Sequence, residues 1–150
     1  EHIDPISLFK QTNFSSTIWW KVKINISGYQ NETENNLVTE IVKNRIFRLI
    51  YPSLYQSKYK LSRILVQFYE DGYICWIDLD KLSIEKFDFK NSFVESNQIL
   101  IQAKIPLILN WIKDRSKVKN IYLWGGTSGP NFDCSGLIQT AFLNLSLIHI

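Results

Sequence analysis

Apolar and polar residues alternate along the first half of the chain, and this pattern predicts short strands. The stretch IWWKVKINIS places apolar residues at every second position, the period of a half-buried strand, at Trp20, Val22, Ile24 and Ile26. The stretch SRILVQFYEDGYICWIDLDKL predicts two strands joined at Asp71-Gly72, a dipeptide typical of hairpins. With the mixed stretch LVTEIVKNRIFRLIY, this gives five short strands in about 75 residues, which favours a small β-barrel.

The period of the apolar positions becomes helical after residue 97. Ser96 and Asn97 can each cap a helix, and the apolar residues that follow recur at helical spacing: Ile99, Leu100, Ala103, Ile105, Ile108, Leu109 and Ile112. Pro106 cannot continue a regular helix, so it marks a kink or the first turn of a second helix.

A further helix is predicted for the stretch CSGLIQTAFLNL. Before it come IYLWGG, which we expect to be a short strand or an extended entry, and the loop TSGPNFD. The apolar positions predict an inner side made of Leu137, Ile138, Ala141, Phe142 and Leu145.

These patterns divide the chain into four segments and predict an α+β protein. We expect a loose leader over residues 1–16, a β-rich domain over 17–87 and a polar linker over 88–97. A helical domain is expected over 98–150.

Composition narrows the class of protein. Apolar residues make up 45% and charged residues 21%, as in ordinary globular proteins. The net charge of +3 is small and the lysines are scattered, which argues against a nucleic-acid partner. There is no apolar run long enough to span a membrane, no Cys/His pattern for zinc and no visible signal peptide. Because the chain starts with Glu1 and contains no Met, we expect a processed chain or a fragment.

Cys134 is the main candidate for chemistry. It opens a predicted helix, where free backbone N–H groups and the positive end of the helix dipole favour a thiolate. The same N–H groups can hold the oxyanion of a tetrahedral intermediate. The alternative is a small buried cysteine in a first helical turn, with Asp133 as a simple cap.

The stretch YLWGGTSGPNFDCSGLIQTAF, residues 122 to 142, closely resembles the active-site signature of NlpC-type cell-wall cysteine peptidases. That signature has an aromatic residue, a WGG-like turn, a short loop and then DCSG on a helix. The β-rich part resembles the bacterial SH3-like domain that precedes the catalytic domain in cyanobacterial-type members. The resemblance therefore implies a small SH3-like β-barrel followed by the helical first half of a papain-like NlpC-type domain.

The resemblance also implies roles for particular residues. Cys134 would be the nucleophile, and Tyr122 would place its hydroxyl near the sulfur and the oxyanion. Asp133 and Ser135 would bind the terminal amine of the substrate. The remaining implied substrate-binding positions are Trp124, Gly125 and Gly126. Tyr122 and Trp124 could instead be core aromatics.

The histidine base is the missing part of this signature. A thiol nucleophile is normally paired with a histidine, which in the family follows the cysteine by several dozen residues. Only His2 and His149 are present, and neither has the expected context. We therefore expect a truncated catalytic domain with little or no peptidase activity alone, and a Cys134 that alkylates only modestly faster than Cys75.

The function implied is a cysteine endopeptidase of peptidoglycan turnover. It would cleave the γ-D-glutamyl to diamino-acid bond of stem peptides that have a free N-terminal L-Ala, with no metal or organic cofactor. We expect the cytoplasm as the site of this recycling, with the periplasm or cell envelope as the alternative. Two further functions stay open: a non-catalytic module that binds wall peptides, and a thiol acyltransferase or amidase on the same fold.

Overall fold

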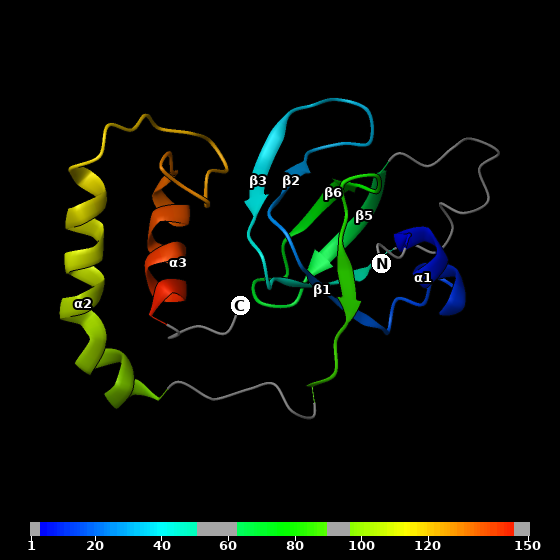
Figure 1. Ribbon diagram of the computed structural model, residues 1–150, viewed down its shortest axis with the longest axis horizontal. Helices are drawn as coiled ribbons and strands as arrows, with labels where there is room; N and C mark the ends of the chain where they lie inside the picture. The colour runs from blue at the N-terminus through cyan, green and yellow to red at the C-terminus, as the bar shows by residue number, and fades with distance from the viewer. Residues whose placement is uncertain (1–3, 51–62, 90–96, 146–150) are drawn as a thin grey trace. The chain divides into compact units, whose positions relative to one another are not determined.

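Three helices and seven strands occur in the part of the chain that the computed structural model describes, residues 4–50, 63–89 and 97–145. The chain divides into two compact units, Glu1–Asp88 and Phe89–Ile150. The first contains α1 Pro5–Gln11, β1 Trp19–Val22, β2 Ile26–Tyr29, β3 Leu37–Ile41, β4 Ile46–Leu49, β5 Arg63–Phe68, β6 Ile74–Asp78 and β7 Ile84–Lys86. The second contains α2 Gln98–Ser116 and α3 Cys134–Asn144 (Figure 1).

The seven strands of the first unit form one antiparallel sheet in the order β3-β2-β6-β5-β4-β1-β7. β3 and β7 are its edges, and no pairing joins them within the described residues. The expected β-rich domain is therefore present, but closure into an SH3-like barrel is not confirmed. An alternating pattern fixes which face of a strand is buried; it carries no information on whether the last strand returns to the first.

The sheet contains two more strands than the sequence predicts. The stretch expected as one strand is divided between β1 and β2, and Ile24 between them is 46% exposed. The chain leaves the sheet there, and the Asn25 side chain accepts a hydrogen bond from the Lys43 amide at 2.8 Å. The mixed stretch forms β3 and β4, with Asn44 at φ 77° between them. Apolar alternation continues from Trp20 to Ile26 through the break between β1 and β2, so the pattern alone hides that break.

The hairpin predicted at Asp71-Gly72 is confirmed. β5 pairs with β6 in antiparallel register, with Val66 opposite Cys75. Gly72 has φ 69°, a conformation that favours glycine, and the Asp71 carboxylate accepts a hydrogen bond from the Tyr73 amide at 2.9 Å. Local turn chemistry was sufficient for this prediction.

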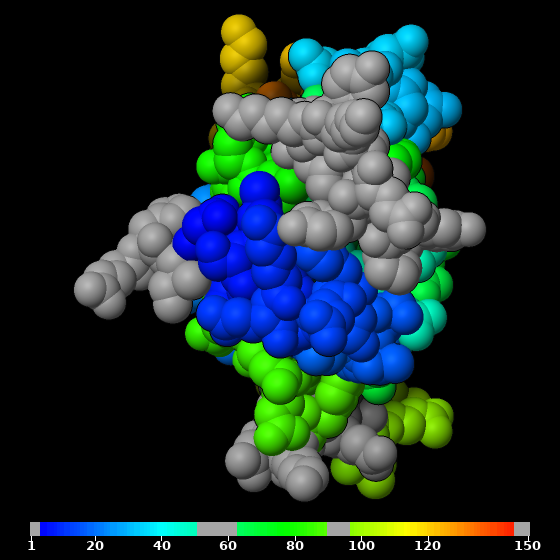
Figure 2. Space-filling model, turned by 90° about the vertical axis from the view of Figure 1, so that its right-hand side faces the viewer, coloured from blue at the N-terminus to red at the C-terminus, as the bar shows by residue number. Residues whose placement is uncertain are grey.

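The segment expected to be a loose leader contains helix α1. Asp4 caps it by accepting a hydrogen bond from the Ile6 amide at 3.3 Å, and Pro5 occupies its first turn. Phe9 is fully buried and contacts the Trp20 ring edge to face, with centroids 5.2 Å apart. Figure 2 shows this dark blue N-terminal segment lying flat on the first unit. α1 is therefore part of the first unit's core.

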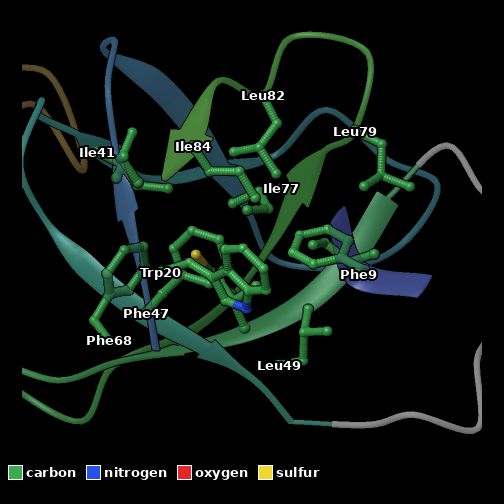
Figure 3. Close-up of a cluster of buried hydrophobic side chains, with 14 residues drawn as sticks. Phe9, Trp20, Ile41, Phe47, Leu49, Phe68, Ile77, Leu79, Leu82 and Ile84 are labelled. Atoms are coloured by element: carbon green, nitrogen blue, oxygen red, sulfur yellow. The ribbon is translucent and has the colours of Figure 1, made fainter. Parts of the chain in front are cut away.

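The core of the first unit is rich in aromatic residues. Figure 3 shows the rings of Trp20, Phe47 and Phe68 gathered with aliphatic side chains between the strands. Ile84 of β7 joins this cluster and pairs with Val22, although the sequence pattern does not predict a strand at Ile84. The linker expected over 88–97 lies mostly outside the described residues.

The second unit is a helix pair with a small core. α2 and α3 run side by side and contact each other through Ile108 and Ala141 (Figure 1). Around these two residues pack partly buried side chains, namely Ile101, Trp111, Ile112, Phe142 and Leu145. α2 is one helix with Pro106 inside it, rather than two helices separated by Pro106.

Several apolar residues predicted at helical spacing in α2 are exposed, namely Ile99 (78%), Leu100 (37%), Ile105 (43%) and Leu109 (53%). Ile138, predicted on the inner side of α3, is 47% exposed. Apolar residues occur on several sides of α2, so helical periodicity alone does not select the face that packs on α3. No helix in the described ranges combines the length and apolar character needed to cross a membrane.

Candidate active site

Cys134 is the first residue of α3, and it is exposed. Asp133 is the N-cap residue, with extended backbone angles of φ −89° and ψ 178°. Its Oδ1 accepts a hydrogen bond from the Gly136 amide at 2.6 Å, as capping aspartates do. The alternative reading of a buried structural cysteine is therefore wrong for Cys134, while the capping reading of Asp133 is confirmed.

Asp133 also connects the helix to the turn that precedes it. Its Oδ2 accepts a hydrogen bond from the Gly125 amide at 2.9 Å, and its Oδ1 accepts one from the Ser135 hydroxyl at 2.9 Å. One carboxylate therefore contacts both the WGG turn and the first turn of α3. This arrangement positions the residues on each side of Cys134.

Two opposing effects set the pKa of Asp133. Partial burial raises this pKa, but hydrogen bonds from Gly136, Ser135 and Gly125 together lower it below its ordinary value. A carboxyl whose pKa is lower in the folded state stabilises the fold above its unfolded pKa. That contribution is lost as the pH falls through the folded pKa. The Asp133 carboxylate is consequently ionised at neutral pH, and its hydrogen bonds to the WGG turn and to the first turn of α3 are retained.

The amides at the start of α3 are not all free to bind an oxyanion. The Gly136 amide donates to Asp133, and the Ser135 backbone also contributes a hydrogen bond to that carboxylate. Within the described part of the chain, no hydrogen bond involves the Cys134 amide. The sequence predicts an oxyanion site from several first-turn amides, whereas the structure leaves the amide of Cys134 itself for that role.

Close backbone contacts fix the turn against the helix. Gly125 has φ 74°, which favours glycine. A Cβ at Gly136 would collide with the carbonyl oxygen of Gly126, and a Cβ at Gly126 would lie 2.6 Å from the Asn131 carbonyl oxygen. The Gly126 carbonyl also accepts a hydrogen bond from the Asp133 amide at 3.2 Å. The observed close approaches of Gly126 are therefore to the chain itself; an approach of either glycine to substrate stays a prediction.

The two aromatic residues of the signature lie on the surface. Tyr122 is 63% and Trp124 is 68% exposed, so neither is a core aromatic. Residues 121–123 form neither a helix nor a strand, and a turn follows at Trp124-Gly125. Both rings are therefore open to a ligand, and their expected roles stay predictions.

Sequence reasoning did not single out two residues that organise the loop before Cys134. The Asn131 Oδ1 accepts a hydrogen bond from the Ile121 amide at 3.0 Å. The Thr140 hydroxyl, one and a half turns into α3, donates to the Thr127 carbonyl at 2.6 Å. Such side-chain to backbone bonds have no fixed spacing along a chain, so a single sequence offers no signal for them.

The candidate bases lie outside the described residues. His2 and His149 are the two histidines of the chain, and the structure describes neither. In the described ranges no group of three or more His, Cys, Asp or Glu side chains is placed to hold a metal ion. The described candidate site consequently consists of an exposed cysteine, its own amide, a capping carboxylate and two exposed aromatics.

Comparison with known proteins supports a hydrolase class for this site. Residues 119–150 match the NlpC/P60 family, and the matched segment includes the WGG turn, Cys134 and α3. The match supports an NlpC-type family of cell-wall peptidases for that segment. A solved structure, NlpC2 from Trichomonas vaginalis, is 19% identical with a TM-score of 0.32; the alignment covers 85% of this chain and 41% of that chain. No curated protein matches the chain.

The two cysteines are expected to differ strongly in reactivity. Cys75 is 2% exposed, and burial raises the pKa of its thiol to about 12. Cys134 is exposed at a helix start. Iodoacetamide at pH 8 should therefore label Cys134 at least about 100-fold faster, since Cys75 lacks both access and thiolate. The burial of Cys75 therefore predicts a larger difference than the sequence does.

Peptide mapping by mass spectrometry over time measures the two labelling rates. Labelling in urea is the control, because unfolding should bring the two rates close together. Equal labelling of Cys75 and Cys134 in the folded protein would contradict the burial of Cys75.

Proposed function

We propose that this chain contributes the nucleophile of an NlpC-type cysteine peptidase that acts on peptidoglycan stem peptides. The bond cleaved is the γ-D-glutamyl to diamino-acid bond, in peptides with a free N-terminal L-Ala. The observation that carries the proposal is an exposed Cys134 at the first position of α3, in the segment that matches the NlpC/P60 family. The cytoplasm, where trimmed stem peptides are recycled, is the proposed compartment; the cell envelope is the alternative.

The proposed reaction is acyl transfer through a thioester. The Cys134 thiolate attacks the γ-carbonyl carbon, and the oxyanion receives hydrogen bonds from the Cys134 amide and the Tyr122 hydroxyl. Collapse of this intermediate breaks the C–N bond as an imidazole donates a proton to the leaving amine. Water, deprotonated by the same imidazole, then attacks the thioester, releasing the acid and the thiolate.

The proposed substrate subsite is next to the cap of α3. Hydrogen bonds from Gly125, Gly136 and both the hydroxyl and the backbone of Ser135 occupy the roughly four acceptor positions of the Asp133 carboxylate. These donors are neutral, so the carboxylate keeps its negative charge and would attract the ammonium group of an N-terminal L-Ala through charge rather than through a free acceptor position. Ser135 is exposed beside it and would contact the same group, while Trp124 would flank the peptide.

Cleavage of an amide substrate by this chain depends on an acid that can protonate the leaving amine. A leaving amine must be protonated, whereas an activated ester leaves as a stable anion without an acid. The imidazoles available are those of His2 and His149. We propose that the chain acylates at Cys134 but turns over an amide substrate slowly or not at all.

The test is the acylation burst with L-Ala-γ-D-Glu p-nitrophenyl ester. The wild-type chain should release about one equivalent of p-nitrophenolate in a fast phase, because one thiol per chain is accessible. Cys134→Ala should lose the fast phase and keep only slow background hydrolysis. Cys75→Ala is the matched control and should keep it.

Stopped-flow absorbance measures the burst amplitude and rate. A burst of equal size in Cys134→Ala would mean that another group reacts, and the proposed function would then be wrong. Parallel incubation with L-Ala-γ-D-Glu-diaminopimelate tests the amide, and multiple turnover of it would show that a proton donor is present in the chain.

A second candidate function is a non-catalytic module that binds wall peptides through the first unit. The observation that favours it is an open groove of about 480 Å³ beside β2, with mixed charge and polarity. It is lined by Ile24, Asn25, Ile26, Ser27, Asp78, Asp80 and Lys81. Calorimetry with a muropeptide distinguishes the two functions: binding without cleavage, weakened by Asp80→Ala and unaffected by Cys134→Ala, supports the module.

A further inference from the structure

The orientation of Tyr122 depends on the backbone that carries it. Its side chain is 63% exposed, and in the described ranges no side-chain hydrogen bond or ring contact involves it. The direction of a largely exposed side chain depends mainly on its own backbone angles and on the bonds that hold the flanking residues. The contacts of Ile121 and Leu123 therefore determine where the Tyr122 hydroxyl can reach.

Both flanking amides are bound by the segment that leads into Cys134. The Ile121 amide donates to the Asn131 Oδ1 at 3.0 Å, and the Leu123 amide donates to the Phe132 carbonyl at 3.3 Å. The two amides therefore tie both flanks of Tyr122 to neighbouring residues of one segment, Asn131 and Phe132. One of the two acceptors is a side chain, so this connection can be removed without changing the backbone.

Asn131 also contacts the WGG turn through its backbone. Its carbonyl oxygen lies against Gly126, where a Cβ would be only 2.6 Å away, and the Asp133 amide donates to the Gly126 carbonyl at 3.2 Å. Asn131 thus contacts the segment before the turn through its amide group and the turn itself through its backbone. Two residues later, Asp133 caps the helix that Cys134 begins.

We propose that Asn131 is a positioning residue that holds Tyr122 in register with Cys134, so that the Tyr122 hydroxyl can donate to the oxyanion. The inference rests on the proposed acyl transfer and adds to it a residue that touches neither substrate nor sulfur. Without the Asn131 acceptor, the Ile121 amide beside Tyr122 is no longer held. A displacement of the Tyr122 hydroxyl on the order of 1 Å costs up to about 100-fold in rate.

The experiment is a double-mutant cycle on the acylation burst with L-Ala-γ-D-Glu p-nitrophenyl ester. The variants are Asn131→Leu, which has similar volume and no acceptor, Tyr122→Phe, and the two combined. Tyr122→Phe should lower the burst rate about 100-fold, since one oxyanion donor is lost. Asn131→Leu should lower it about tenfold in the wild-type background and leave it unchanged in the Tyr122→Phe background. Asn131→Asp, which retains an acceptor oxygen, should keep a near wild-type rate.

The outcomes separate this inference from the proposed function. Absence of a burst in the wild-type chain overturns the proposed function, and the inference with it. A burst that Asn131→Leu lowers equally in both backgrounds overturns the inference alone, because a general structural role would act without Tyr122. Thermal unfolding of each variant is measured in parallel; if Asn131→Leu reduces the folded fraction, Asn131→Ala replaces it in the cycle with the same expectations.

Discussion

Substitution of Gly136 by alanine is expected to displace the start of α3 and to disable Cys134. The new Cβ would collide with the Gly126 carbonyl oxygen and would also lie 3.0 Å from the Thr127 side chain. Both obstacles belong to the turn that Asp133 binds, and a backbone carbonyl cannot rotate away as a side chain can. The helix start and the turn must therefore separate.

The expected magnitude follows from two opposing terms. Alanine is a better helix former than glycine by about 1 kcal/mol, which favours the variant. Overpacking at a rigid site costs about 3 kcal/mol, which outweighs it. We expect a net loss of about 2 kcal/mol in the stability of the helix pair. The acylation burst should slow by about 100-fold because the Cys134 amide shifts from the oxyanion position.

Amide hydrogen exchange of α3 and the p-nitrophenolate burst measure these two effects. Gln139→Ala, in the same helix but away from the turn, is the matched control and should leave both unchanged. A Gly136→Ala protein with native exchange in α3 and a native burst would show that the helix and the WGG turn do not meet as described.

Replacement of Arg63 by alanine is expected to destabilise the first unit strongly, and much more than replacement of Arg48 by alanine. The Arg63 side chain is 7% exposed and donates four hydrogen bonds. Its Nε donates to Asp78 at 2.8 Å, and its terminal nitrogens donate to the Asn31 and Glu34 carbonyls and to the Asn35 side chain. The Tyr29 ring lies 3.7 Å from the guanidinium carbon.

Truncation of a buried charge partner leaves the other groups without compensation. In Arg63→Ala, Asp78 at 16% side-chain exposure loses its main partner, and the turn over 31–35 loses three hydrogen bonds. Breaking a buried ion pair in this way costs about 3–5 kcal/mol. Arg48→Ala is the matched control. Arg48 donates twice to Gln67, lies less deeply in the unit, and should cost below about 1 kcal/mol.

Urea unfolding, followed through the backbone amide resonances of β5 and β6, measures both variants separately from the helix pair. Arg63→Lys is expected to recover only a small part of the loss, because an ammonium cannot reproduce the fork of donors. Equal midpoints for Arg63→Ala and Arg48→Ala would contradict the role assigned to Arg63.

Local chemistry made part of the fold predictable. Asp71-Gly72 identified a hairpin, and Asp133 followed by Cys134 identified the start of a helix, since turns and caps depend on neighbouring residues. The division of the first strand near Ile24, the return of Phe9 into the core and the strand at Ile84 depend on contacts between distant residues. A periodic pattern cannot report such contacts.

The candidate site was predictable in its residues but less so in their arrangement. The DCSG and WGG letters located Cys134 and the exposed Tyr122 and Trp124. They did not indicate that Asp133 accepts hydrogen bonds from two amides of the first helical turn. Nor did they indicate that the Asn131 side chain accepts one from the Ile121 amide. Those bonds follow from the path of the loop in space, which sequence spacing does not determine.

The proposed peptidase function requires that the Cys134 sulfur forms a thioester with a γ-glutamyl acyl group. Peptide mass spectrometry of protein acid-quenched during the burst with L-Ala-γ-D-Glu p-nitrophenyl ester detects this thioester. We expect one acyl group per chain, on the peptide that contains Cys134, released by hydroxylamine and absent from Cys134→Ala. Acyl groups found only on lysines, or in equal amount on Cys134→Ala, would show that the proposed thioester does not form.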